Sequence, residues 1–157
     1  MKEKAQNIAC VILAAGKGTR MRSTMPKVMH KVAGKPMLMH VIDTALSCNA
    51  QKVVAVTAPE MEQVRNNVKT HYSGAVDNAV QHQQLGTGDA VKAAEEALKG
   101  FSGNVIVLYG DTPLIARETI LAMDATLNAS SRLAVAVLGM EVQEPNAYGR
   151  LVVNKDG

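Results

Sequence analysis

Short apolar runs alternate with amphipathic stretches along this chain. Each run is four to six residues long, is rich in β-branched and aliphatic side chains, and is bounded by polar positions. Runs of this kind predict buried β-strands. The strands predicted in this way are residues 8–13, 52–57, 104–109, 133–138 and, with a weaker pattern, 76–81.

Between these runs, apolar residues recur at helical spacing. Pro36 suits a first helical position, and Pro59 opens a second helix that directs Met61, Val64 and Val68 inward. Two further helices are predicted over residues 87–99, with Thr87 as the N-cap, and over residues 117–127. Alternating strands and helices predict an α/β fold: a Rossmann-like, mostly parallel sheet with helices on both faces.

The length of 157 residues fits one domain, residues 1–157. After a turn at residues 148–150, Leu151, Val152 and Val153 predict a short strand. The final Lys-Asp-Gly is typical of a hairpin turn, and no second strand follows it. We therefore expect the C-terminal part of the domain to be missing.

Composition excludes several classes of function. Hydrophobic residues make up 47% of the chain, charged residues 20% and aromatic residues 3%, and the net charge is only +3. No basic surface with interleaved aromatics is evident, so nucleic-acid binding is not expected. No apolar run is long enough to insert into a membrane and no signal peptide is evident, which favours a cytoplasmic location. Cys10 and Cys48 are expected to be buried thiols.

The loop after the first predicted strand carries the clearest chemistry. Small residues follow the strand, and cations crowd the next turns. Backbone N–H groups in such a loop can bind an anion, and the loop lies at the carboxyl end of a strand, where open α/β sheets bind ligands. It is neither a Walker A motif nor a dinucleotide fingerprint, and an ordinary turn with solvated cations stays an alternative. The residues concerned are Leu13, Ala14, Ala15, Gly16 and Gly18, with Lys17, Arg20, Arg22 and Lys27.

Two later segments suit a nucleotide and a metal. Gln81, Gly86 and Thr87 lie between a predicted strand and a helix, and a glutamine amide can match the edge of a nucleobase. Asp111 follows a predicted strand after Tyr109 and Gly110, where a lone carboxylate suits Mg²⁺. The alternatives are a capped helix with solvated glutamines and an aspartate that caps a turn. The four histidines show no zinc-site spacing.

These motifs occur together, in this order, in a known family. The segments at residues 13–21, 26–28, 84–88, 109–111 and 148–150 resemble those of sugar-1-phosphate nucleotidyltransferases. The similarity is greatest to the uridyltransferase domain of the bifunctional N-acetylglucosamine-1-phosphate uridyltransferase/glucosamine-1-phosphate acetyltransferase family. It implies the nucleotide-diphospho-sugar transferase fold and the Mg²⁺-dependent conversion of UTP and N-acetylglucosamine 1-phosphate into UDP-N-acetylglucosamine and pyrophosphate. That product feeds bacterial peptidoglycan and lipopolysaccharide synthesis.

The resemblance also implies roles for individual residues. Arg20 would hold the triphosphate, and Lys27 would contact the α-phosphate and the sugar phosphate. The cradle for the nucleotide would be Leu13, Ala14, Ala15, Gly16 and Gly18. Gln81, Gly86 and Thr87 would read uracil, Tyr109 and Gly110 would line the nucleotide–sugar site, Asp111 would bind Mg²⁺, and Gly149 would contact the amino sugar.

Several expectations follow from the chain's short length. Family members assemble as trimers through an acetyltransferase domain, and this chain carries neither that domain nor the second protein ligand of the metal. We expect the chain to bind nucleotide weakly and to turn over poorly or not at all. A cytidylyltransferase of the same fold and an inactive nucleotide-binding fragment stay open as alternatives, whereas Met21 argues against a dinucleotide-binding oxidoreductase domain.

Overall fold

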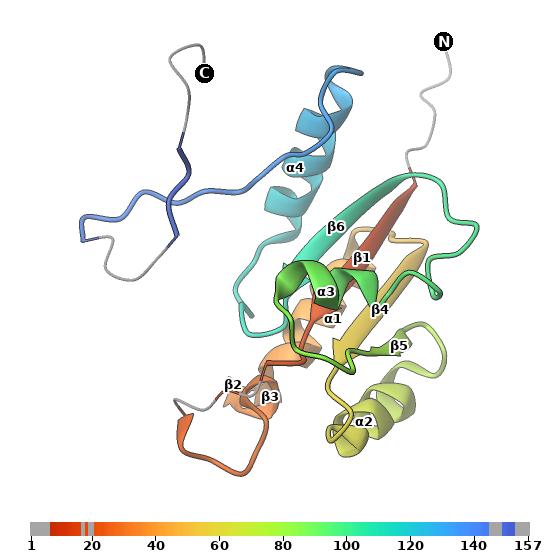
Figure 1. Cartoon of the computed structure of the whole chain (residues 1–157), viewed down its shortest axis with the longest axis vertical. Helices are drawn as coiled ribbons and strands as arrows, with labels where there is room; N and C mark the ends of the chain where they lie inside the picture. Colours follow the sequence, from red (N-terminus) through yellow and green to blue (C-terminus); the bar gives the residue numbers. More distant parts are fainter. Residues whose placement is uncertain (1–6, 17, 19–20, 145–148, 153–157) are drawn as a thin grey trace. The chain divides into compact units, whose positions relative to one another are not determined.

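The computed structural model describes residues 7–16, 18, 21–144 and 149–152. The chain forms two compact units, Met1–Leu121 and Ala122–Gly157. The first contains a four-stranded parallel sheet in the order β5-β4-β1-β6 (Figure 1). Its strands are β1 (Ile8–Leu13), β4 (Lys52–Thr57), β5 (Asp77–Val80) and β6 (Asn104–Tyr109).

The two central strands of this sheet are buried on both faces. Strand β1 pairs with β4 on one side and with β6 on the other, so that Leu13 lies opposite both Val56 and Tyr109. Val11 and Val54 are fully buried. Continuous runs of branched apolar residues suit strands that helices cover on both faces, and this pattern predicted β1, β4 and β6 with their observed bounds. The burial predicted for β6 was only half right, because Val105, Val107 and Tyr109 are exposed on one face of the strand.

Helices cover the two faces of the sheet unequally. Helices α1 (Met37–Ser47) and α2 (Glu62–Tyr72) pack on the face that carries Cys10, Ile12 and Ile106, and Ile120 from α4 (Arg117–Asn128) joins this larger core. The opposite face carries Val11, Val54 and Val56 and is covered by α3 (Thr87–Lys92). Figure 1 shows α3 in front of the sheet and α1 behind it.

All four strands run in the same direction, so their carboxyl ends meet at one edge. The loops after β1, β5 and β6 therefore start close together. A short helix, η2 (Lys27–Met29), and a small antiparallel hairpin, β2 (Lys31–Val32) with β3 (Lys35–Pro36), lie between β1 and α1 in the chain. The fold thus brings three segments that are far apart in the sequence to one edge of the sheet: the connection after β1, the segment after β5 and the end of β6.

The predicted helices needed small corrections. Helix α1 begins one residue after Pro36, and α2 begins at Glu62, because the chain first turns between Ala58 and Met61 through a hydrogen bond of 3.0 Å. Thr87 is not an N-cap: it is the first residue of α3, and Gly86 with φ of +114° takes the cap position. Helix α4 extends one residue beyond the predicted end, to Asn128.

The helix predicted over residues 87–99 was too long. Helix α3 ends at Lys92, and turns follow, with several hydrogen bonds that reach back only three residues, such as Glu95 N–H to the Lys92 carbonyl at 3.0 Å. The Lys52 ammonium donates to the Ala97 carbonyl at 2.6 Å. The alanine-rich run is therefore not one continuous helix, and helix propensity alone did not place the end of α3.

The strand predicted over residues 133–138 was wrong. These residues belong to the second unit and form no strand, and Val135 and Val137 are well exposed. A high β-propensity indicates a fit to a half-buried sheet, so it has no effect without a partner strand. Leu151 and Val152 are also not in a strand, whereas Val153 and the predicted hairpin turn lie outside the described residues.

Both cysteines are buried and free, as predicted. Burial raises the pKa of the Cys10 thiol to about 12, and burial also raises the pKa of Cys48. In the described part of the chain, no helix has the length and apolar character that crossing a membrane requires.

Candidate functional site

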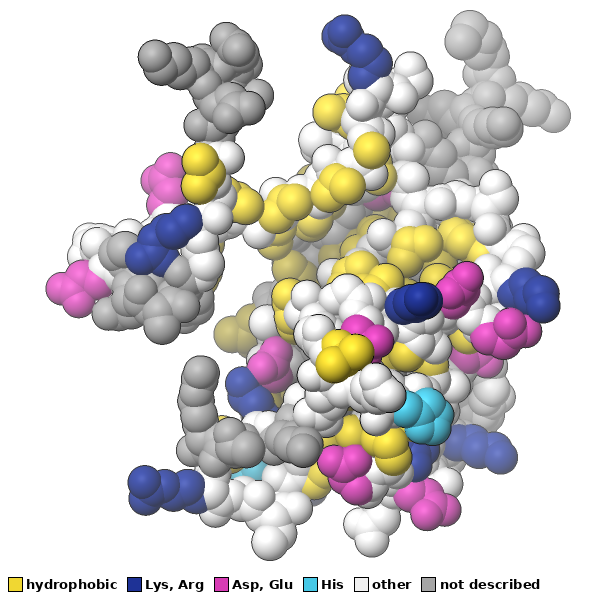
Figure 2. Space-filling view, in the orientation of Figure 1, with side chains coloured by type: hydrophobic (Ala, Val, Ile, Leu, Met, Phe, Trp, Pro, Cys, Tyr) yellow, Lys and Arg dark blue, Asp and Glu magenta, His cyan; other side chains and the backbone are white. Residues whose placement is uncertain are grey.

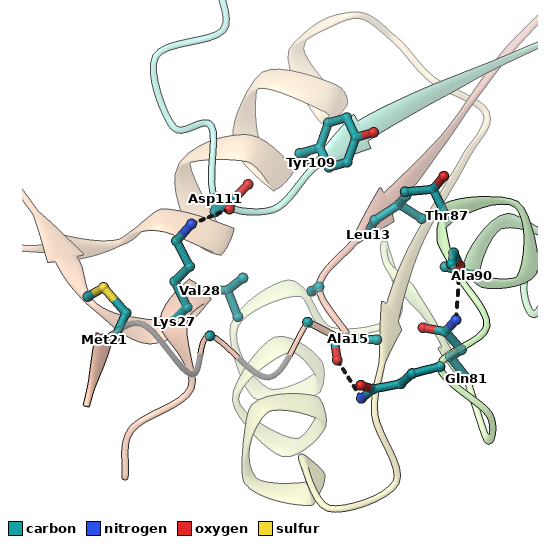
Figure 3. Close-up of a pocket in the computed structure, with 15 residues that line it drawn as sticks. Leu13, Ala15, Met21, Lys27, Val28, Gln81, Thr87, Ala90, Tyr109 and Asp111 are labelled. Atoms are coloured by element: carbon teal, nitrogen blue, oxygen red, sulfur yellow. Dashed lines mark hydrogen bonds and ion pairs between the residues drawn. The ribbon is translucent and has the colours of Figure 1, made fainter. Parts of the chain in front are cut away.

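A pocket of about 510 Å³ lies at the carboxyl edge of the sheet (Figure 3). Its walls come from the loop after β1, from η2, from the segment between β5 and α3, and from the end of β6. This is the edge where open α/β sheets bind ligands. The lining residues are Leu13, Ala14, Ala15, Gly16, Gly18, Met21, Lys27, Val28, Gln81, Gln84, Gly86, Thr87, Ala90, Tyr109 and Asp111.

The loop after β1 first continues the sheet pairing at Ala14 and then becomes exposed at Gly16. Ala14 is buried, and its N–H donates to the Val56 carbonyl at 2.8 Å. Gly16 is exposed, and a Cβ built there meets no atom within 4 Å. Gly18 has φ of +58°, and a Cβ there would approach the Lys27 Cβ to 2.7 Å. Glycine is therefore required at 18, because it gives the loop its turn and lets Lys27 lie against it.

Lys27 and Asp111 form an ion pair in this pocket. The Lys27 Nζ donates to the Asp111 Oδ2 at 2.6 Å, and the two side chains are 41% and 32% exposed. Lys27 opens η2, whereas Asp111 follows β6, 84 residues later. Gly110 fixes this end of β6, since its N–H donates to the Leu13 carbonyl at 2.9 Å.

Lys27 is the one cation among the described lining residues. On the face that Figure 2 shows, Lys and Arg side chains are interspersed with Asp and Glu. Attraction for a polyanion at this pocket therefore depends on individual cations that are directed into it. Within the described part of the chain, Asp111 has no cluster of three or more His, Cys, Asp or Glu around it that could hold a metal alone.

The opposite wall of the pocket is built from amides. Gln81 is buried, its backbone N–H donates to the Thr57 carbonyl at 2.9 Å, and its side-chain Nε2 donates to Gly86 and Asp89. The Gln84 Nε2 donates to the Ala15 carbonyl at 3.0 Å. This bond joins the segment before α3 to the loop after β1, as Figure 3 shows.

The structure brings most of the predicted site residues together. Those that line the pocket are Leu13, Ala14, Ala15, Gly16, Gly18, Lys27, Gln81, Gly86, Thr87, Tyr109 and Asp111. Gly110 lies directly behind them, in contact with Leu13. Arg20 lies outside the described residues, and Gly149 belongs to the second unit. The binding roles of all these residues stay predictions.

Residues to which the sequence analysis gave no binding role also contribute. Met21, Val28 and Ala90 line the pocket, and Gln84 and Asp89 hold its polar groups in place. Gln84 stood in a glutamine-rich segment, but nothing in the sequence indicated that it reaches Ala15. The contact between Asp89 and Gln81 depends on a turn of the chain at Gly86, which sequence spacing alone does not specify.

Comparison with known proteins identifies the family. The family model described as a MobA-like NTP transferase domain matches residues 10–155. The chain therefore belongs to the MobA-like NTP transferase domain family, and this agrees with the predicted α/β nucleotidyltransferase fold.

Curated relatives support a more specific similarity. The bifunctional protein GlmU of Paramagnetospirillum magneticum is 45% identical over 98% of this chain, and the match covers 33% of that protein. GlmU of Hyphomonas neptunium is 45% identical over 100% of this chain, again covering 33% of the relative. The chain thus spans about a third of the length of these relatives.

Solved structures share the fold at low sequence identity. The structure of Rv0371c from Mycobacterium tuberculosis H37Rv has a TM-score of 0.66 at 20% identity and covers 80% of this chain and 62% of its own. A UDP-glucose pyrophosphorylase from Acinetobacter baumanii has a TM-score of 0.62 at 20% identity and covers 79% of this chain and 53% of its own. These likenesses confirm the predicted fold class.

Proposed function

We propose that this chain is the nucleotide-binding part of a uridyltransferase that converts UTP and N-acetylglucosamine 1-phosphate into UDP-N-acetylglucosamine and pyrophosphate. The observation that carries the proposal is the pocket itself, in which the Lys27–Asp111 pair and a small-residue loop face the amide of Gln81. A charged wall suits a triphosphate, and an amide wall suits a base. The similarity to GlmU proteins supports the choice of UTP and of the amino-sugar phosphate.

The proposed reaction needs positioning more than acid–base chemistry. An ionised oxygen of the sugar phosphate attacks the α-phosphorus of UTP and forms a new P–O bond, while the bond to the bridging oxygen breaks and pyrophosphate leaves. Lys27 reaches into the pocket and would neutralise charge on the α-phosphate and on the sugar phosphate. Arg20, Tyr109 and Gly110 are proposed as further contacts to the triphosphate and the nucleotide–sugar.

Asp111 is the residue in this pocket that would hold Mg²⁺. Mg²⁺ usually takes one or two carboxylates together with phosphate oxygens and water, and a single partly exposed aspartate fits that pattern. When bound, the ion would neutralise phosphate charge. The bond to Lys27 uses one Asp111 oxygen and one ammonium N–H, which leaves the second carboxylate oxygen and two N–H groups for a metal ion and a phosphate.

The wider role follows from the product. A UDP-activated amino sugar is a precursor for peptidoglycan and lipopolysaccharide, and we propose that role, in the cytoplasm, for the full enzyme. Gly149 is proposed to contact the amino sugar.

Calorimetric titration with UTP, CTP, dTTP and ATP, each with Mg²⁺, tests this function. We expect preferential binding of UTP, weakened by Asp111→Ala and unchanged by Asp43→Ala. Asp43 is a matched control because it also pairs with a lysine, Lys35, but does not line the pocket. A preference for CTP would move the assignment to a cytidylyltransferase. No binding of any of the four nucleotides would contradict the proposal for this chain.

A further inference from the structure

The side-chain amide of Gln81 is held in one orientation at the wall of the pocket. Gln81 is only 5% exposed. Its Nε2 donates to the Gly86 carbonyl at 3.2 Å and to the Asp89 Oδ2 at 2.8 Å. An amide nitrogen carries two N–H groups, so these two bonds use both of them. Figure 3 shows the carbonyl oxygen of Gln81 on the side of the amide that faces the pocket.

The chemistry of the two partners fixes this orientation. A backbone carbonyl and a carboxylate can only accept hydrogen bonds. Rotating the amide by half a turn would place the Gln81 oxygen against two acceptors. It would also remove both Gln81 N–H groups from the Gly86 carbonyl and the Asp89 carboxylate. The bond to Asp89 is the shorter of the two, and hydrogen bonds to a charged group are the stronger class. Asp89 therefore contributes most to holding the Gln81 amide in this orientation.

A Gln81 carbonyl oxygen that is held in one orientation can discriminate between pyrimidine bases. At ring position 3, uracil carries an N–H donor and cytosine carries a bare nitrogen acceptor. We infer that Asp89 is a positioning residue that keeps the Gln81 carbonyl oxygen toward the base, so that the pocket accepts a base with a donor at position 3 and rejects one with an acceptor there. The inference rests on the proposed function, since it names how the same pocket selects its nucleotide.

A purely structural role for Asp89 predicts something different. Asp89 lies in the first turn of α3, where a negative charge stabilises a helix. Loss of that effect alone would lower the stability of the chain or weaken every ligand to the same extent. It would not change the ratio of the affinities for UTP and CTP, so this ratio separates the two roles.

The test compares Asp89→Asn with Glu95→Gln by calorimetry with UTP, CTP and tripolyphosphate, each with Mg²⁺. Glu95 is an exposed acid just beyond α3 and serves as the matched control. The asparagine amide in the first variant can offer an N–H to Gln81 and so permits the rotated orientation. We expect the ratio of UTP to CTP affinity to fall roughly tenfold in Asp89→Asn, with tripolyphosphate affinity unchanged, and Glu95→Gln to match the wild type.

A double-mutant cycle tests whether Asp89 acts through Gln81. In a Gln81→Ala background, Asp89→Asn should change the UTP to CTP ratio by no more than about twofold. A tenfold change in that background would contradict the inference, because Asp89 would then act by another route. As a readout without ligand, the side-chain NH₂ signals of Gln81 in ¹⁵N-edited NMR should shift in Asp89→Asn and stay unchanged in Glu95→Gln.

The other outcomes separate this inference from the proposed function. Equal binding of UTP and CTP by the wild type would overturn the inference and leave a nucleotide-binding pocket in place. An unchanged ratio in Asp89→Asn, or an equal loss for all three ligands, would also overturn it. Absence of both UTP and CTP binding in the wild type would overturn the proposed function and, with it, the inference.

Discussion

The two sides of the pocket are built in different ways. The phosphate side, formed by residues 13–16 and 18 with Lys27 and Asp111, presents full charges and extends from β1, at the centre of the sheet. The base side, formed by residues 81–90, follows the edge strand β5 and presents a neutral amide. Its one anchoring charge, on Asp89, lies behind Gln81 and is not among the lining residues.

Because the two sides differ in this way, one can supply affinity for the ligand and the other can supply selectivity for the base. Charge on the phosphate side attracts any nucleoside triphosphate, since every such ligand carries the same phosphates. Oriented hydrogen-bonding groups on the base side distinguish one base from another. Changes on the phosphate side should therefore weaken all nucleotides together, whereas changes on the base side should alter their ranking.

The largest effect is expected from Lys27→Ala. The variant removes the one described cation of the pocket wall and leaves Asp111 without its partner, so phosphates meet an unopposed carboxylate. Affinity for UTP and for tripolyphosphate should both fall about 10- to 100-fold, as for a lost hydrogen bond to a charged group. Calorimetry measures this, with Lys35→Ala as the control lysine that pairs with Asp43 outside the pocket. A loss confined to UTP would contradict the division into two sides.

An intermediate effect is expected from Gly18→Ala. The positive φ and the 2.7 Å approach to the Lys27 Cβ should force the loop to move, at a cost of about 1–2 kcal/mol in the free energy of unfolding. Denaturant unfolding measures that cost. Gly16→Ala is the control, because its Cβ meets no atom within 4 Å, and its unfolding free energy should stay within about 0.5 kcal/mol of wild type. Equal stability of the two variants would show that the loop geometry is not fixed at Gly18.

The smallest effect is expected from Gln84→Ala, which removes the bond between the two sides. Its bond to the Ala15 carbonyl spans 69 residues of sequence, but the side chain is exposed. Loss of one such bond costs about 0.5–1.5 kcal/mol, or roughly two- to tenfold in UTP affinity. Tripolyphosphate affinity should change less. A larger loss for tripolyphosphate than for UTP would place Gln84 on the phosphate side.

The sequence predicted the phosphate side better than the base side. Strands β1, β4 and β6 each carry a local signal, although β6 is buried on one face only, and the rule that ligands bind at carboxyl ends placed Lys27 and Asp111 at one edge. The links from Gln81 to Asp89 and from Gln84 to Ala15 depend on a chain path through Gly86 that no periodicity encodes. The strand prediction for residues 133–138 was wrong for a related reason: a strand needs a partner strand, and the local sequence pattern does not specify one.

Chemical-shift mapping of the chain by NMR, with tripolyphosphate and UTP compared in the presence of Mg²⁺, tests the two-sided pocket most directly. Tripolyphosphate should perturb the described residues of the phosphate side, namely Gly16, Gly18, Lys27 and Asp111, and leave Gln81 and Gly86 unchanged. UTP should perturb both sets. Identical perturbations from both ligands, or perturbation of Gln81 by tripolyphosphate alone, would contradict the account.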